Sequence, residues 1–189
     1  MIRGIDDRNI LDSFAEKFCK VVDRHVRYIV VSGFVAIAHG RTRATEDIDM
    51  IIERIDFNTF KKLHEELIKE GFECLQSSKA EEIYDYLVKG DSVRYVKTGS
   101  FLPPEMEMKF AKDDIDEIQI KTRKKLPFTG LDIWFSNIEM NIAFKEEYLK
   151  TNKDMEDARH LRIIYKDEIS EDDINKIKKM IREKRLNKK

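Results

Sequence analysis

Apolar residues recur at two different spacings along this chain of 189 residues, and the spacing separates expected helices from expected strands. Ile10, Phe14 and Phe18 follow one another every four residues, which predicts an amphipathic helix over residues 7–24. The same criterion predicts further helices over residues 35–39, 58–70 and 79–89. Alternating or continuous apolar runs predict strands over residues 27–31, 48–52, 72–76, 93–97, 105–111 and 131–135.

The pattern changes after residue 135, where only helical spacing remains. It predicts helices over residues 138–149, 154–165 and 171–186. Residues 113–124 are ambiguous, because their DDID start favours a helix whereas the IQIKT run favours a strand. We therefore expect an α/β (α+β) fold: an α/β domain over residues 1–135 with a small mixed sheet, and a helical lobe over residues 136–189 packed against it.

Composition narrows the class of protein. The net charge is −1 with 39% charged residues, so no overall basic field favours nucleic acid. The apolar runs are shorter than the roughly 20 residues of a membrane span, and the first nine residues are too polar for a signal peptide. Cys19 and Cys74 lack metal-site spacing, so we expect buried free thiols and a cytoplasmic protein.

Candidate chemistry concentrates in residues 32–52, SGFVAIAHGRTRATEDIDMII, which join two apolar strands. Side chains alternate along a strand, so Asp47 and Asp49 are expected on one face, about 7 Å apart. Two such carboxylates suit divalent metals such as Mg²⁺ or Mn²⁺. In the loop before them, Arg43 is placed to fork onto phosphate oxygens and Thr45 to hydrogen-bond the Asp47 loop.

This segment resembles the signature of the nucleotidyltransferase superfamily: a Gly-rich turn, a short helix and a D-x-D on the next strand. The R-x-T before the acidic pair looks most like the branch of abortive-infection toxin nucleotidyltransferases. The resemblance implies that Asp47 and Asp49 hold metals, and that Ser32 and Gly33 form the turn that carries the phosphates of a nucleoside triphosphate.

The resemblance also requires a third carboxylate on a neighbouring strand. In the run MEMKF, Glu107 and Lys109 alternate with two methionines, so Glu107 is expected on the polar face. Asp132 in LDIWF has the same appearance. Order along the chain favours Glu107, and Asp132 stays the alternative.

A later stretch, FSNIEMNIAFKEEYL followed by NKDMEDARHL, resembles two further motifs of the toxin branch. Lys145 matches an inward-facing lysine, Lys153 and Asp154 match a K-D pair, and Asp157 matches a second acid. The resemblance gives Lys145 the role of neutralising charge on the leaving pyrophosphate. It gives Asp157 the role of orienting that lysine or the base.

Taken together, the resemblance implies Mg²⁺- or Mn²⁺-dependent transfer of a nucleoside monophosphate from an NTP to a hydroxyl of RNA, protein or a small molecule, with a link to toxin–antitoxin systems. The alternative is an inactive relative that binds a nucleotide or a partner, because Phe34 replaces a small residue in the turn. The basic run over residues 174–189 and the cluster over residues 121–125 make tRNA or other RNA a candidate partner.

Overall fold

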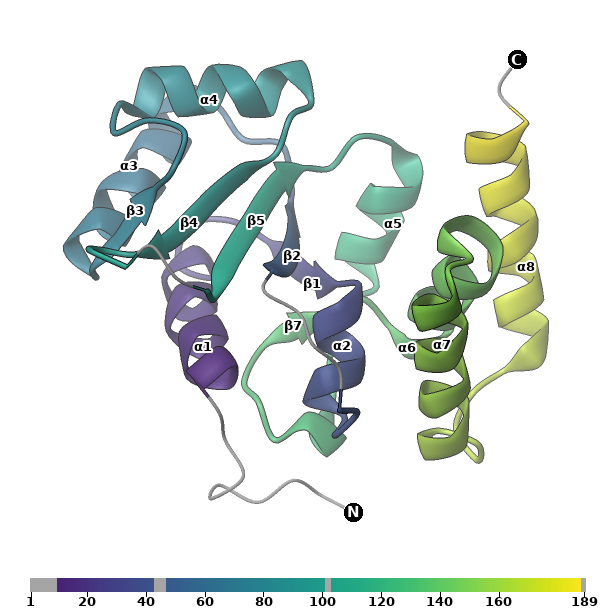
Figure 1. Ribbon diagram of the computed structural model, residues 1–189. Helices are drawn as coiled ribbons and strands as arrows, with labels where there is room; N and C mark the ends of the chain where they lie inside the picture. The colour runs from purple at the N-terminus through teal and green to yellow at the C-terminus, as the bar shows by residue number, and fades with distance from the viewer. Residues whose placement is uncertain (1–9, 43–46, 101–102, 188–189) are drawn as a thin grey trace.

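The computed structural model describes residues 10–42, 47–100 and 103–187, and a mixed sheet of seven described strands carries its fold (Figure 1). The strand order is β3-β4-β5-β2-β1-β7-β6. Strand bounds are β1 Tyr28–Val31, β2 Asp47–Ile52, β3 Phe72–Cys74, β4 Val93–Lys97, β5 Glu105–Phe110, β6 Lys124–Lys125 and β7 Trp134–Phe135. The pairs β2–β5 and β1–β7 are parallel, and the other neighbours are antiparallel.

Helices flank the sheet and form the whole C-terminal part of the described chain. Their bounds are α1 Ile10–Val22, α2 Gly33–Ala38, α3 Phe57–Lys69, α4 Ala80–Lys89, α5 Asp114–Lys121, α6 Ile138–Phe144, α7 Asn152–Ile164 and α8 Glu171–Ile181. Short turns η2 Pro127–Thr129, η3 Lys145–Leu149 and η4 Arg182–Leu186 complete the list. Figure 1 shows α6, α7 and α8 gathered on one side of the sheet. The predicted α/β class with a helical C-terminal lobe is confirmed.

Alternation along the central strands separates the core from the polar face. Met50 on β2 and Met108 on β5 are fully buried in the main core together with Phe18 of α1 and Phe60 of α3. Burying each such side chain contributes roughly 1.5–3 kcal/mol. A register slip of one residue would turn this apolar set to the other face, so the core fixes which residues of β2 and β5 face the opposite side.

Most of the segment 113–124, ambiguous in sequence, forms helix α5, and its last residue, Lys124, begins β6. The Asp113 carboxylate accepts hydrogen bonds from the backbone N–H groups of Ile115 and Asp116, at 3.0 and 3.2 Å. This N-cap satisfies donors that a helix start leaves without partners, and it decides the segment in favour of the helix.

The predicted strand over residues 131–135 is too long, because only Trp134–Phe135 pair as β7. The N–H of Leu131 donates to Thr129 Oγ1 at 3.1 Å, and that of Asp132 donates to Glu16 at 3.4 Å. These two N–H groups thus donate to side chains, whereas in a strand they would donate to carbonyl groups of the neighbouring strand. Strand β6, which lies in the basic cluster of residues 121–125, was not predicted, and neither was its pairing with β7.

Cys19 and Cys74 are both free and buried, as predicted. Among the described residues, no helix combines the length and the apolar character needed to cross a membrane.

Candidate active site

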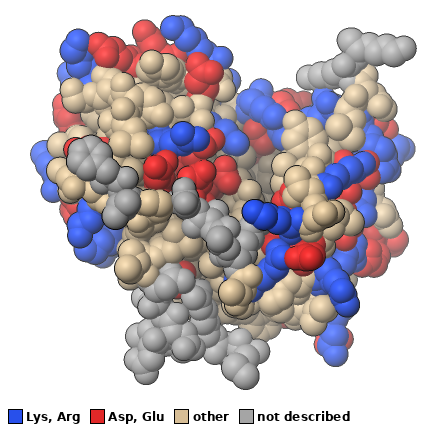
Figure 2. All heavy atoms as spheres, in the orientation of Figure 1, with Lys and Arg blue, Asp and Glu red and all other residues tan. Residues whose placement is uncertain are grey.

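Four carboxylates lie on the polar face where β2 and β5 run side by side. The parallel register places Asp49 opposite Glu107 and Asp47 opposite Glu105. Neighbouring strands are about 4.8 Å apart, so each pair of side chains is within reach of one bound cation. Figure 2 shows acidic side chains gathered near the middle of the molecule. Glu105 was not among the predicted site residues, although alternation along the predicted strand puts it on the same face as Glu107; the register then pairs it with Asp47.

Arg94 of β4 also lies on this face and was not predicted. It is opposite Glu107 in register, and its Nη2 lies 3.2 Å from Glu107 Oε2. Its Nε lies 3.6 Å from Glu105 Oε2. The hydrogen bond and charge of Glu107 raise the pKa of Arg94. The positively charged guanidinium of Arg94 therefore lies within the acidic cluster and offsets part of its negative charge.

The Asp49 carboxyl lies in an unfavourable environment for its charge. Burial is the largest cause that raises its pKa, and the nearby Glu107 and Asp47 raise it further. Lys109 and a hydrogen bond from Ser32 act in the opposite direction. A partly buried carboxylate whose negative charge is not fully compensated by its neighbours is a suitable ligand for a cation.

The turn before α2 brings backbone close to Asp49. Ser32 has φ 66° and ψ −136°, a region that residues with a side chain rarely occupy. Gly33 follows as the first residue of α2 and is buried. Phe34 is fully buried in the core, with its ring centroid 6.4 Å from that of Phe135. The Phe34 ring thus packs into the core and does not line the cavity beside Asp49.

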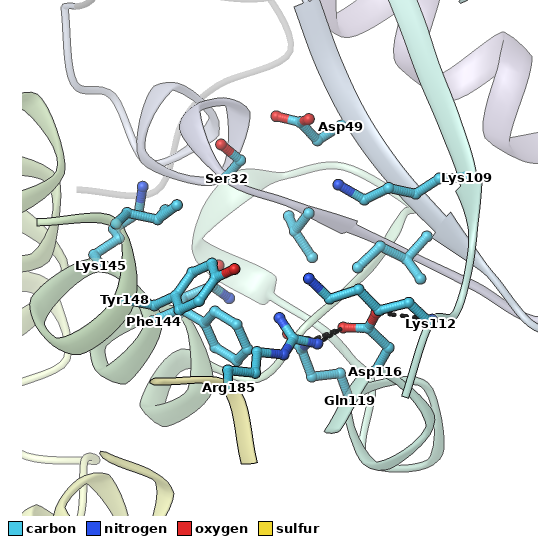
Figure 3. A pocket seen from close by; sticks show the side chains of 14 residues that line it. Ser32, Asp49, Lys109, Lys112, Asp116, Gln119, Phe144, Lys145, Tyr148 and Arg185 are labelled. Carbon is cyan, nitrogen blue, oxygen red and sulfur yellow. Dashed lines mark hydrogen bonds and ion pairs between the residues drawn. The ribbon is translucent and has the colours of Figure 1, made fainter. Parts of the chain in front are cut away.

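A cavity of about 180 Å³ opens beside Ser32 and Asp49 (Figure 3). Its walls come from strands β1, β2 and β5, from α5 and from the helical lobe. Fourteen residues line it: Val31, Ser32, Asp49, Ile51, Lys109, Lys112, Asp116, Gln119, Asn141, Phe144, Lys145, Tyr148, Leu149 and Arg185. The cavity therefore joins the sheet motif and the later lysine motif, which are almost one hundred residues apart in sequence.

Lys145 begins the π-helical turn η3, and its side chain is almost fully buried. Its Nζ donates to Asp157 Oδ2 at 2.9 Å and lies 3.7 Å from Asp154 Oδ1. Asp157 also forms an ion pair with Arg41. Lys145 and Asp157 are thus brought together as the motif implied, with Lys145 lining the cavity that contains Asp49.

The remaining candidates are placed differently. Asp132 is 83% exposed, pairs with Lys125 and lies on a surface depression beside Glu16 and Lys20. It does not line the cavity or pair with β2, so the structure brings Glu107, and not Asp132, next to Asp49. Arg43 and Thr45 lie outside the described residues.

The C-terminal basic run is not a free tail where the structure describes it. Arg185 is 93% buried in its side chain and donates to Asp113 and Asp116, while Lys184 pairs with Asp114 at 2.6 Å. Arg185 also lies over the rings of Phe144 and Tyr148, 5.0 and 5.6 Å from their centroids. Lys184 and Arg185 are therefore held by acids of α5, and RNA as a partner stays a prediction from the sequence. Lys188 and Lys189 lie outside the described residues.

Carboxylate oxygens are the ligands that Mg²⁺ and Mn²⁺ prefer, so the donor set of Asp47, Asp49 and Glu107 fits such an ion chemically. The side chains are not yet arranged for it. Within the described residues, no group of three His, Cys, Asp or Glu side chains is placed to hold an ion together. Glu107 instead contacts Arg94 of β4, at 3.2 Å.

No family model and no curated protein sequence matches the chain. Solved structures do match it along most of its length. The solution structure of the antibiotic-resistance factor ANT(2'')-Ia gives a TM-score of 0.53 at 13% identity, covering 92% of each chain. The crystal structure of ANT(2'')-Ia in complex with adenylyl-2''-tobramycin gives 0.56 at 13% identity, covering 93% of this chain and 98% of that one.

A third match is the crystal structure of an antigenic nucleotidyltransferase-like protein from Paracoccidioides brasiliensis, with a TM-score of 0.55 at 15% identity. It covers 93% of this chain and 88% of that one. Likeness at such identities establishes a fold. The chain has a nucleotidyltransferase-type fold, as the sequence motif predicted.

Proposed function

We propose that the protein transfers a nucleoside monophosphate from an NTP to an acceptor hydroxyl, with Mg²⁺ or Mn²⁺. The observation that carries the proposal is the register of β2 and β5, which sets Glu107 beside Asp49, a residue in the cavity wall. The same cavity is lined by Ser32 and Lys145, which belong to the two other parts of the resemblance.

The step joins the acceptor oxygen to the α-phosphorus and breaks the bond from that phosphorus to the bridging oxygen. Pyrophosphate leaves with the electron pair, and the hydroxyl proton passes to a carboxylate or to water. Glu107 is the carboxylate that receives it in this proposal. Ser32 and Gly33 hold the outer phosphates near the turn, and Lys145 neutralises charge that develops on pyrophosphate. Asp157 keeps Lys145 in place through the 2.9 Å contact.

Asp47, Asp49 and Glu107 would hold the metal ions. A bound divalent ion supplies positive charge to the α-phosphate and to both the attacking and leaving oxygens. The raised pKa of Asp49 supports this assignment, because a cation would offset the cost of its burial next to like charges. Binding requires Glu107 to turn away from Arg94.

A small-molecule hydroxyl is the acceptor that we place first. The ligand of the matched ANT(2'')-Ia complex, adenylyl-2''-tobramycin, joins an adenylyl group to a small molecule. In this chain, the described part of the C-terminal basic run is bound by the protein's own acids, which removes the main reason to favour RNA. The toxin–antitoxin link stays a prediction from the sequence resemblance.

A second function has one specific observation in its favour. Arg94 forms ion pairs with both Glu107 and Glu105. If its guanidinium stays there, its positive charge takes the place of a metal ion. The protein would then bind a nucleotide or a partner without turnover.

The test is a pyrophosphate-release assay with each of the four NTPs and Mg²⁺ or Mn²⁺, against tobramycin, bulk tRNA and a mixture of hydroxylated metabolites. Release in one combination that disappears in the Asp47→Asn/Asp49→Asn double variant is the expected result. Binding of an NTP with no release in any combination would favour the second function.

A further inference from the structure

The cavity beside Asp49 has four cationic side chains in its wall, and two of them are already neutralised. Lys145 is paired with Asp157, and Arg185 is paired with Asp113 and Asp116. Lys109 and Lys112 differ from these two. Among the described residues, neither ammonium group has an ion pair within 4.0 Å.

The two lysines come from one short stretch of chain at the end of β5. Lys109 is half-buried and lies opposite Ile51 of β2, two residue pairs further along the strands than Glu107 and Asp49. Lys112 follows the strand and is anchored by its backbone N–H, which donates to Asp116 at 3.1 Å. Figure 3 shows both side chains extending into the space between the sheet and the helical lobe.

Within the described part of the chain, no carboxylate forms an ion pair with the Lys112 ammonium group. Its Nζ lies 5.6 Å from the ring centroid of Tyr148, on the far wall of the cavity. Asp116, the acid closest in the chain, already receives Arg185, Gln119 and the backbone of Lys112. The charge of Lys109 lowers the pKa of Asp49, the carboxylate assigned above to a metal ion.

We infer that Lys109 and Lys112 form a subsite for a phosphate group of the substrate, on the wall of the cavity beside Asp49. A lysine is a compact, strongly hydrated charge that binds phosphate without a fixed geometry, and two of them on one wall attract a multiply charged anion. A volume of about 180 Å³ exceeds that of a cavity that accepts benzene, so a phosphate group fits with room for its neighbour.

This inference rests on the proposed transfer reaction. That reaction offers two sources for the phosphate group. It belongs either to the outer phosphates of the NTP or to a phosphorylated acceptor. In both cases Lys109 and Lys112 would lie beside the carboxylate at which the nucleotidyl group is transferred. Binding of the anion itself does not depend on turnover, so it is tested without metal and without an acceptor.

The first experiment is calorimetric titration of the full chain with inorganic tripolyphosphate in EDTA. The Lys109→Gln/Lys112→Gln double variant should bind at least tenfold more weakly than the wild type, with a shallower dependence on salt. Lys61→Gln/Lys89→Gln is the matched control, since it makes the same change in net charge at two exposed lysines on α3 and α4. Thermal melting of each variant shows that the fold is retained.

The second experiment separates the two sources. If the subsite holds the outer phosphates of the nucleotide, the cavity variant loses affinity for the preferred NTP and keeps its affinity for the corresponding NMP. If it holds a phosphate of the acceptor, NTP affinity is unchanged, and inorganic phosphate binds to the NTP-saturated wild type but not to the cavity variant. Either pattern supports the subsite.

Two results would overturn the inference. One is a wild-type protein that binds neither tripolyphosphate nor phosphate. The other is a cavity variant that binds both as tightly as the control variant does. A failure of the proposed transfer reaction would instead leave the metal-free titrations unchanged, so the two failures are distinguishable.

Discussion

Arg185 Nη2 lies 2.6 Å from Asp116 Oδ1, and this contact joins the C-terminal end of the described chain to helix α5. Both side chains are nearly buried, at 7% and 2% exposure. The same guanidinium makes two hydrogen bonds to Asp113, the N-cap of α5. Because Arg185 also lines the cavity, it fixes the position of η4 relative to the aromatic wall formed by Phe144 and Tyr148.

The first prediction concerns this contact. Arg185→Met should lower the free energy of unfolding by about 3 kcal/mol, because it leaves Asp116 buried without its cation. Arg182→Met is the matched control. Arg182 pairs with Glu147 at 2.8 Å but is 47% exposed, so its loss should cost no more than about 1 kcal/mol. Urea unfolding measures both, and equal effects would contradict the structural role of Arg185.

The second prediction is loss of metal binding. Asp47→Asn together with Asp49→Asn should abolish the calorimetric heat of Mn²⁺ binding without unfolding the protein, because both side chains lie on the polar face and outside the main core. Circular dichroism verifies the fold. Mn²⁺ binding of unchanged strength in this double variant would remove the metal site.

The third prediction is a pH dependence that follows from Asp49. Its pKa in the folded protein is raised above the ordinary 3.8, mainly by burial. A raised carboxyl pKa means that its contribution to stability is complete below the unfolded pKa and is lost as pH rises through the folded one. Without metal, Asp49→Asn should therefore be more stable than the wild type at pH 7, with the difference shrinking toward pH 3.

Denaturation at a series of pH values in EDTA measures this effect. Asp56→Asn is a useful comparison, because hydrogen bonds from Thr59 lower the pKa of Asp56. That variant should show the opposite sign, with a loss of stability that grows as pH rises through the acid range and stays constant above it. Parallel pH profiles for the two variants would mean that burial does not control Asp49.

Much of the fold and part of the site were predictable because they depend on local pattern. Alternation placed Asp47, Asp49 and Glu107 on polar faces, and helical spacing found the later helices. Arg94 was missed, since its part in the site depends on the register between strands, which no single segment records, whereas alternation already put Glu105 on the face of Glu107. The division of the chain at residue 135 stays a prediction.

The C-terminal run shows a different limit. Lys184 and Arg185 have the composition of a solvated basic tail, and composition carries no information on the acids that a distant helix presents. Asp113 and Asp114 belong to α5, about seventy residues earlier in the chain. The DDID sequence that signalled a helix start thus also provides the partners of the C-terminal residues.

The fourth prediction tests whether Arg94 competes with a metal ion. Arg94→Met removes the cation from Glu107 and Glu105. Mn²⁺ should then bind several-fold more tightly, because Glu107 no longer has to leave an ion pair. The control Arg54→Met changes an arginine that donates to the Ala111 carbonyl outside the acidic cluster. Unchanged affinity in Arg94→Met would exclude Glu107 as a ligand and favour the function without turnover.

The last prediction concerns Lys145 and Asp157, which are 1% and 0% exposed. Lys145→Met should destabilise the fold by about 3 kcal/mol, because Asp157 would lose a buried partner. Adding Asp157→Asn to that variant should cost less than the same change in the wild type, giving a coupling on the order of 2 kcal/mol.

The same double variant tests whether Lys145 also neutralises charge on pyrophosphate. In that case it is less destabilised than the sum of the two single changes, and it still fails to release pyrophosphate. Lys150→Met removes a lysine that is 54% exposed and pairs with Glu147, and it should change neither property. Pyrophosphate release at the wild-type rate in the double variant would limit Lys145 to a structural role.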